Sequence, residues 1–356
     1  MIILKLIFTF VLSYFFIKLI INNALYLGLT DIPNERSSHT KITPRGAGIG
    51  FGFSFFISIL IFEFSLFLEY WIVFLSIFMV FLVGILDDHK DATPRAKFYV
   101  IFLATIFLFL DDISIYSLGV FLGLELKLWY FALPFTMFAL AGFTNALNLI
   151  DGLDGLAGTI SLVILSTFLY IGYINNDNLI VTLCLFSMTS ILAFLIFNWN
   201  PADIFMGDSG SLFLGFVISV IAVISLKYIH PISVFYLTAL PILDTIVVMV
   251  RRIKKRISPF SPDKTHIHHI LLGFFSKKVK TTVIFLILLQ CLFSIAGLMM
   301  ANSSNKLTLG SYSFFAFVAF IFIIALFYMV LTGMKRRQKL IEKLSNRKKR
   351  INSKQK

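Results

Sequence analysis

Charged residues are scarce in this sequence, where Asp, Glu, Lys and Arg make up only 14% of 356 residues. Soluble domains carry about a quarter, so a chain with 58% hydrophobic residues is not a soluble globular protein. Cysteine is also scarce: Cys184 and Cys291 both lie in apolar runs, which excludes a disulfide framework. The first apolar run lacks the small-residue cleavage site of a signal peptide. We therefore interpret it as a retained first span of an integral membrane protein.

Long apolar runs dominate what is present. A helix needs about 20 apolar residues to cross a bilayer, and the sequence contains eleven runs close to this length. The pattern predicts an all-α polytopic membrane protein with about 11 transmembrane helices. No connection is long enough to form an independent soluble core. The predicted spans are residues 3–23, 48–66, 69–86, 98–116, 129–149, 156–174, 179–198, 211–229, 232–250, 282–301 and 311–333.

Basic residues are distributed unevenly between the connections. Of the 31 lysine and arginine residues, 26 lie in alternate connections and in the C-terminal tail, namely residues 24–47, 87–97, 150–155, 199–210, 251–281 and 334–356. Because positive charge accumulates on the cytoplasmic side, the N-terminus is predicted to lie outside and the C-terminus in the cytoplasm. The chain then divides into a membrane domain, residues 1–333, and a basic cytoplasmic tail, residues 334–356. This topology and anionic lipid headgroups explain the net charge of +13, so we expect no nucleic-acid partner.

Five polar clusters lie in the predicted cytoplasmic connections. The basic residues of the first cluster could meet an anion or form a solvated loop: Arg36, His39, Lys41 and Arg45. In the second, GILDDHKDATPRAKF, Asp87 and Asp88 end an apolar span. Adjacent carboxylates repel unless a cation or a proton intervenes, which favours a divalent metal or a general base. Lys97 could return over this pair. The alternative is that both acids are simply solvated.

The third and fourth clusters add carboxylate and amide oxygens. NALNLIDGLDGLAG contains four polar residues spaced by three, which share a helix face: Asn145, Asn148, Asp151 and Asp154. Oxygen ligands at this spacing suit Mg²⁺ or sugar hydroxyls, whereas the alternative is a polar turn capped by Asp154. FNWNPADIFMGDSGSLF contains Asn198 and places Asp208 between glycines that leave room for an anion. Its alternative is a helix N-cap at Asp208 or Ser209.

The fifth cluster, RRIKKRISPFSPDKTHIHHILLG, contains Arg252 and three close histidines: His266, His268 and His269. No Cys or Glu completes a usual zinc spacing, and imidazoles beside cations would also suit diphosphate oxygens. The chain has no P-loop, dinucleotide fingerprint or nucleophile elbow. Acids for a metal and cations for anions therefore predict a Mg²⁺-dependent phosphoryl-group site at one membrane face.

Five segments, in this order, resemble the polyprenyl-phosphate N-acetylhexosamine-1-phosphate transferases: SSHTKITPRGAG, GILDDHKDATPRAKF, NALNLIDGLDGLAG, FNWNPADIFMGDSGS and SPFSPDKTHIHH. The resemblance covers about residues 31–270 and agrees with the predicted topology. It implies that a UDP-sugar gives an N-acetylhexosamine 1-phosphate to undecaprenyl phosphate, forming undecaprenyl-diphosphate-sugar and UMP. This would be the first membrane step of O-antigen or other cell-surface polysaccharide synthesis. The implied location is the bacterial inner membrane, with the active site of the membrane domain on the cytoplasmic face.

The resemblance also implies roles for residues at matching positions. Asp208 would be the principal ligand of Mg²⁺, or of Mn²⁺ in its place, with Asn148 nearby. Asp87 and Asp88 would activate or orient the lipid phosphate. Substrate binding would fall to Lys97, Asn145, Asn148, Asp151, Asp154, Asn198, Arg252, His266, His268 and His269. The sequence leaves open the amino sugar and the choice between direct attack and an aspartyl-phosphate intermediate, and a homodimer is compatible with the family.

An ion-coupled membrane transporter is the main alternative. Asp244 lies within a predicted span, where an ionisable residue is costly and usually has a partner or a function. Broken helices around such a residue could form an ion path. However, the ionisable clusters lie at one face rather than near the membrane midplane, and no inverted repeat is found. These observations favour an enzyme.

Overall fold

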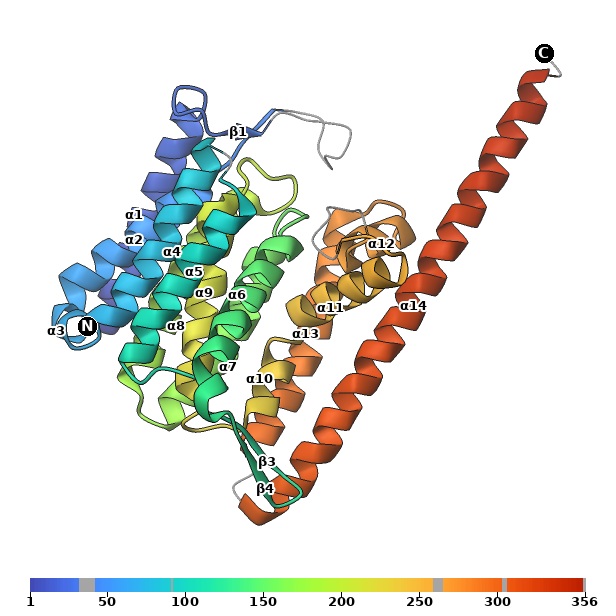
Figure 1. The fold of residues 1–356 in the computed structure, drawn as a ribbon. Coiled ribbons are helices and arrows are strands. Elements are labelled where there is room, and N and C mark those ends of the chain that lie inside the picture. Colours follow the sequence, from blue (N-terminus) through green and yellow to red (C-terminus); the bar gives the residue numbers. More distant parts are fainter. Residues whose placement is uncertain (32–41, 91, 259–264, 303–305, 355–356) are drawn as a thin grey trace.

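The computed structural model describes residues 1–31, 42–90, 92–258, 265–302 and 306–354. The chain is a bundle of apolar helices with two short β-hairpins at its ends (Figure 1). The all-α fold class is therefore confirmed. The helices are α1 (Ile2–Asn23), α2 (Ala47–Phe62), α3 (Phe64–Glu69), α4 (Trp71–Lys90), α5 (Pro94–Leu110), α6 (Ala132–Ile150), α7 (Leu156–Ile174), α8 (Asn178–Asn198), α9 (Gly207–Ser225), α10 (Pro231–Leu237), α11 (Ala239–Lys254), α12 (Ile267–Phe274), α13 (Val279–Ala301) and α14 (Lys306–Lys354).

The hairpins lie at opposite ends of the bundle (Figure 1). Strands β1 (Thr30–Asp31) and β2 (Thr43–Pro44) pair antiparallel, as do β3 (Ser117–Phe121) and β4 (Leu124–Lys127), which precede the 3₁₀ turn η1 (Trp129–Phe131). The connections predicted to be cytoplasmic gather at the β1 end, and α14 extends beyond that end. The β3–β4 hairpin and α3 lie at the other end. The alternation of the connections is thus seen in the fold, whereas the orientation in a membrane stays a prediction.

The predicted spans all fall mainly on helix, but they differ in length. Within the described residues, eight helices are long and apolar enough to cross a membrane, and a ninth span is possible if the bent pair α10–α11 counts as one. Helix α2 has only 16 residues and α5 only 17. Many membrane spans are therefore established, while the count of eleven stays a prediction.

The predicted span 232–250 is not one straight helix. Helices α10 and α11 meet at Thr238 with a bend of 86°. A break in an apolar environment frees backbone groups that need partners, and the buried Gln290 of α13 supplies them. Its Oε1 accepts a hydrogen bond from Leu240 N at 3.0 Å, and its Nε2 donates to Leu237 O at 2.7 Å. One buried amide therefore stabilises the bend.

Helix α9 is the centre of the bundle and is almost entirely buried. Phe213 packs edge-on against the rings of Phe55 and Phe81 from α2 and α4. Glycines of α2 and α4 allow close backbone contact with the first turn of α9. A Cβ on Gly48 would lie 1.9 Å from the backbone N of Gly210, and one on Gly84 would lie 2.6 Å from Ser209 Cα. The turn that begins with Asp208 is therefore held between α2 and α4.

Candidate active site

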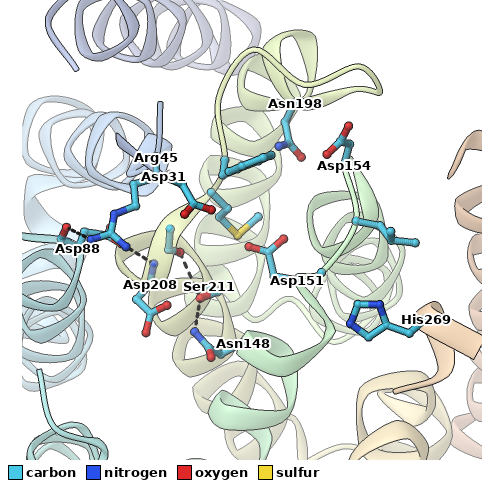
Figure 2. A pocket seen from close by; sticks show the side chains of 15 residues that line it. Asp31, Arg45, Asp88, Asn148, Asp151, Asp154, Asn198, Asp208, Ser211 and His269 are labelled. Carbon is cyan, nitrogen blue, oxygen red and sulfur yellow. Dashed lines mark hydrogen bonds between the residues drawn. The ribbon is translucent and has the colours of Figure 1, made fainter. Parts of the chain in front are cut away.

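A cavity of about 350 Å³ opens at the β1 end of the bundle (Figure 2). Its wall is formed by the connection after α6, the connection between α8 and α9, the first turn of α9, and β1. The wall includes many of the residues predicted from the sequence: Asp88, Asn148, Asp151, Asp154, Asn198, Asp208 and His269. Clusters more than 150 residues apart in the chain therefore meet in one place, at the face predicted to be cytoplasmic.

Lys97 connects two of the predicted acids. From the first turn of α5 its Nζ donates to Asp87 Oδ2 at 2.7 Å and also to Asp208 Oδ2. The three side chains are largely but not fully buried, with 21%, 13% and 28% of their surfaces exposed in that order. The sequence predicted that Lys97 lies over Asp87 and Asp88. The structure confirms the contact with Asp87, but the second acid that Lys97 contacts is Asp208 and not Asp88. The arrangement holds Asp208 at the cavity with a cation beside it.

Asp88 points the other way, toward the start of α9. Its Oδ1 accepts a hydrogen bond from Asp208 N at 2.8 Å, and its Oδ2 accepts one from Ser209 N at 3.0 Å. Only 2% of the residue is exposed, and Arg45 donates to its backbone O at 2.8 Å. Gly207 has a φ of 76°, and a Cβ there would lie 2.6 Å from the Asp88 carboxylate. Asp88 therefore caps the N-terminus of α9, where a carboxylate is favourable.

Asp154 and Asn198 join the two connections that form the opposite wall. Asp154 Oδ2 accepts hydrogen bonds from Asn200 Nδ2 at 2.7 Å and from Ala202 N at 3.2 Å. Asn198 Oδ1 accepts from Gly155 N, and its Nδ2 donates to Ile204 O, both at 2.8 Å. Although both residues line the cavity, these groups are already engaged within the protein. Their role in the structure is to brace the cavity wall.

Asn148 and Asp151 are better placed to reach a ligand. Asn148 Nδ2 donates to Ser211 Oγ at 2.7 Å, which leaves the amide oxygen for another partner. Within the described chain, the Asp151 carboxylate accepts no hydrogen bond. Burial, followed by the charges of Asp208, Asp154 and Asp88, raises the pKa of Asp151 to about 7. A carboxylate without a partner in an acidic cavity is well suited to meet a cation.

The donors suit Mg²⁺ better than zinc. Mg²⁺ is usually bound by one or two carboxylates and completed by water and substrate phosphates, which matches Asp208, Asp151 and Asn148 around one cavity. Among the described residues, no group of three His, Cys, Asp or Glu could hold a metal ion. In addition, Nδ1 of His266 is hydrogen-bonded to Asp244 at 2.8 Å. The zinc alternative for the histidine cluster therefore has no support in the geometry.

Several predicted residues lie outside the cavity wall. Asp87 and Lys97 are connected to it only through the contact of Lys97 with Asp208, and four further residues are more distant. Asn145 lies one turn before Asn148 on α6, and Arg252 is buried at the end of α11. His266 and His268 are buried behind His269, which alone of the three histidines lines the cavity. The structure gives these four residues no direct access to a ligand in the cavity. Three further basic candidates of the first cluster lie outside the described residues: Arg36, His39 and Lys41.

The structure also adds residues that sequence reasoning did not place in the site. Asp31, Ser211 and Phe205 line the cavity. Arg45 lines it too, although the sequence offered it only as one of four basic residues in a loop. Asp31 opens the first cluster and Ser211 completes GDSGS, so the motifs contained both. Only the pairing of β1 with β2 brings Asp31 and Arg45 to the same wall.

The fold and the cavity define a class: multi-pass membrane enzymes with an acidic site at one end of a helix bundle. Residues 70–226 match the family model described as Glycosyl transferase family 4. A probable undecaprenyl-phosphate N-acetylglucosaminyl 1-phosphate transferase of Bacillus subtilis is 34% identical over 85% of this chain and 83% of its own length. An undecaprenyl-phosphate alpha-N-acetylglucosaminyl 1-phosphate transferase of Salmonella typhi is 30% identical over 77% of this chain and 78% of its own length. A protein of the same name from Escherichia coli K12 is 30% identical over 71% of this chain and 72% of its own length. This chain therefore belongs to that family of sugar-1-phosphate transferases.

Proposed function

We propose that the protein transfers an N-acetylhexosamine 1-phosphate from a UDP-sugar to undecaprenyl phosphate, forming undecaprenyl-diphosphate-sugar and UMP. The observation that carries this proposal is the meeting of Asp87, Lys97 and Asp208 beside the acidic cavity, where Asp208 forms part of the wall. In this proposal the lipid phosphate approaches Lys97 from the bilayer, and the soluble nucleotide sugar enters the cavity from water. The names of the relatives give undecaprenyl phosphate and an N-acetylglucosaminyl 1-phosphate group, which supports the proposed acceptor and the proposed transferred group.

The reaction is a substitution at the β-phosphorus of the sugar nucleotide. An oxygen of the lipid phosphate forms the new bond to this phosphorus, and the bond to the oxygen that bridges to the α-phosphate breaks. UMP leaves with that oxygen. Asp87 faces Lys97 and is placed to orient the entering lipid phosphate or to accept its proton. Lys97 offsets negative charge that develops on the transferred group.

Asp208, Asn148 and Asp151 would hold Mg²⁺ or Mn²⁺. The metal would neutralise phosphate oxygens of the donor. In this proposal Asp88 does not touch substrate, because both of its carboxylate oxygens bind the start of α9. It fixes the position of Asp208 instead. Asp154 and Asn198 keep the donor side of the cavity in shape.

The cytoplasmic face of the bacterial inner membrane is the proposed location. The polar connections of the cavity belong to the alternate set of connections that, with the C-terminal tail, contains 26 of the 31 Lys and Arg residues. The product would begin O-antigen or another cell-surface polysaccharide. Asp244 was the main support for the transporter alternative, and its hydrogen bonds to the start of α12 favour a structural role instead.

The test is UMP release by the purified protein in lipid nanodiscs. With a panel of UDP-N-acetylhexosamines, we expect UMP only when undecaprenyl phosphate and Mg²⁺ are both present, and EDTA should abolish it. Asp208→Asn should lower turnover by at least about 100-fold. Asp203→Asn is the matched control, because Asp203 is exposed on the same connection and does not line the cavity. Failure of every donor to yield UMP would refute the proposal, and full activity in Asp208→Asn would place the metal elsewhere.

A further inference from the structure

Asp244 lies on α11 inside the broken span and is 1% exposed. Both of its carboxylate oxygens bind the start of α12. Oδ1 accepts a hydrogen bond from Ile267 N at 2.7 Å, and Oδ2 is 2.8 Å from Nδ1 of His266. The residue at the N-cap of α12, His266, makes no capping hydrogen bond with its own side chain. Asp244 therefore supplies the cap from another helix.

A chain of contacts continues from this cap to the cavity. The His266 ring stacks on the His268 ring at 5.8 Å and 12°, and the His268 and His269 rings are 4.3 Å apart. His268 is 1% exposed and presses on Gly152, where a Cβ would lie 2.3 Å from His268 Nε2. Gly152 and His269 both line the cavity. A shift of the first turn of α12 would therefore move the cavity wall.

The far end of α12 is held independently. Gln338 of α14 donates from Nε2 to Ile270 O at 2.8 Å, and a Cβ on Gly273 would lie 2.7 Å from the same Nε2. Loss of the Asp244 contacts would thus free the half of α12 that carries His268 and His269, while the other half stays attached to α14. Figure 2 shows that His269 lies across the cavity from Asp88 and Arg45. The affected wall is therefore the one opposite Asp88 and Arg45.

We propose that Asp244 is a positioning residue for the nucleotide-sugar side of the cavity: it acts through His266 and His268 to place His269 and the Asp151–Gly152 turn. The inference rests on the proposed function, because it assigns this wall to the soluble donor and the Lys97 side to the lipid phosphate. Burial, followed by the charges of His269 and His266, lowers the pKa of His268 well below its ordinary value. His268 therefore acts as a neutral wedge against Gly152.

The first test is Asp244→Asn, which keeps the shape of the side chain but places an amide where a carboxylate oxygen faced His266. We expect the KM for the UDP-sugar to rise about 10-fold, as for loss of a residue that orients a ligand-binding histidine. The KM for undecaprenyl phosphate should stay within about twofold. Thr245→Val is the matched control, because it changes the next residue of α11 and removes a buried hydroxyl that has no described hydrogen-bond partner. It should keep both KM values.

A double-mutant cycle separates positioning from general damage. Gly152→Ala should also raise the donor KM, because its methyl group meets the His268 ring. In the Asp244→Asn background, Gly152→Ala should raise the donor KM by a clearly smaller factor, because His268 is already displaced. Additive effects, or an equal rise in both KM values, would overturn the inference. If Asp244→Asn does not fold, His266→Asn replaces it, and an unchanged donor KM in that variant overturns the inference equally. A wild-type protein that releases no UMP would refute the proposed function instead.

Discussion

Replacing Asp88 with Asn should destabilise the folded protein, because the Asp88 carboxylate holds the first turn of α9 in place. The carboxylate accepts hydrogen bonds from two consecutive backbone amides, those of Asp208 and Ser209. An Asn side chain can accept only one of them and turns an NH₂ group toward the other. A buried donor without a partner costs about 1–3 kcal/mol, and losing the negative charge at a helix N-terminus costs about 0.3–1 kcal/mol more. The expected loss of stability is about 2–3 kcal/mol.

Asp87→Asn is the matched comparison, because the two acids are neighbours in sequence. Lys97 keeps its contact with Asp208 when Asp87 is changed, and an Asn side chain can still accept a hydrogen bond from Lys97, so the stability should fall by less than in Asp88→Asn. Both variants should lose most UMP formation. Thermal unfolding in detergent should distinguish them, with a fall of about 5 °C for Asp88→Asn and little change for Asp87→Asn. Equal melting temperatures with unequal turnover would refute the assignment of Asp88 to the α9 cap.

Two further predictions concern the bend and the histidine cluster. Gln290→Leu should cost at least about 2 kcal/mol, because it leaves the Leu240 N–H and the Leu237 carbonyl without partners, whereas Ser294→Ala should cost less than about 1 kcal/mol in the same melting assay. Because the pKa of His268 is lowered in the folded protein, its contribution to stability is complete above the unfolded value of about 6.5 and is lost as the pH falls below it. Wild type should therefore lose more stability between pH 7.5 and 5.5 than His268→Asn, and equal losses would contradict the buried neutral state.

The sequence predicted the helices and the meeting of the clusters, because both follow from strong and simple signals. Apolar runs set the spans, and the charge bias set which connections share a face. Once the connections were assigned to one face, clusters as distant as those of Lys97 and Asp208 had to lie at the same end of the bundle. Lys97 and Asp87 are only ten residues apart, on either side of one turn, so their contact could also be predicted from the sequence.

The different roles of Asp87 and Asp88 could not be predicted from the sequence. Asp87 and Asp88 share the same sequence context and differ mainly by the rotation of about 100° between successive residues of a helix. The position of α9 decides which of them meets Lys97 and which meets backbone amides. The bend at Thr238 could not be predicted either. The residue that stabilises it, Gln290, is one polar residue within a long apolar run, and nothing in that run indicates which backbone groups it binds.

The polar residues of this membrane protein divide into those that serve the backbone and those that remain for chemistry. Asp88, Asp154, Asn198 and Asp244 all satisfy backbone groups at helix ends or in connections. Even so, the described cavity wall carries five aspartates against a single arginine: Asp31, Asp88, Asp151, Asp154 and Asp208, with Arg45. Both proposed substrates are anions, and Coulomb repulsion would keep their phosphates out of such a wall. Lys97, beside this wall, supplies one further positive charge. A divalent cation is the simplest means of reversing the sign of the cavity, so the acidic surplus supports the proposed metal independently of any motif.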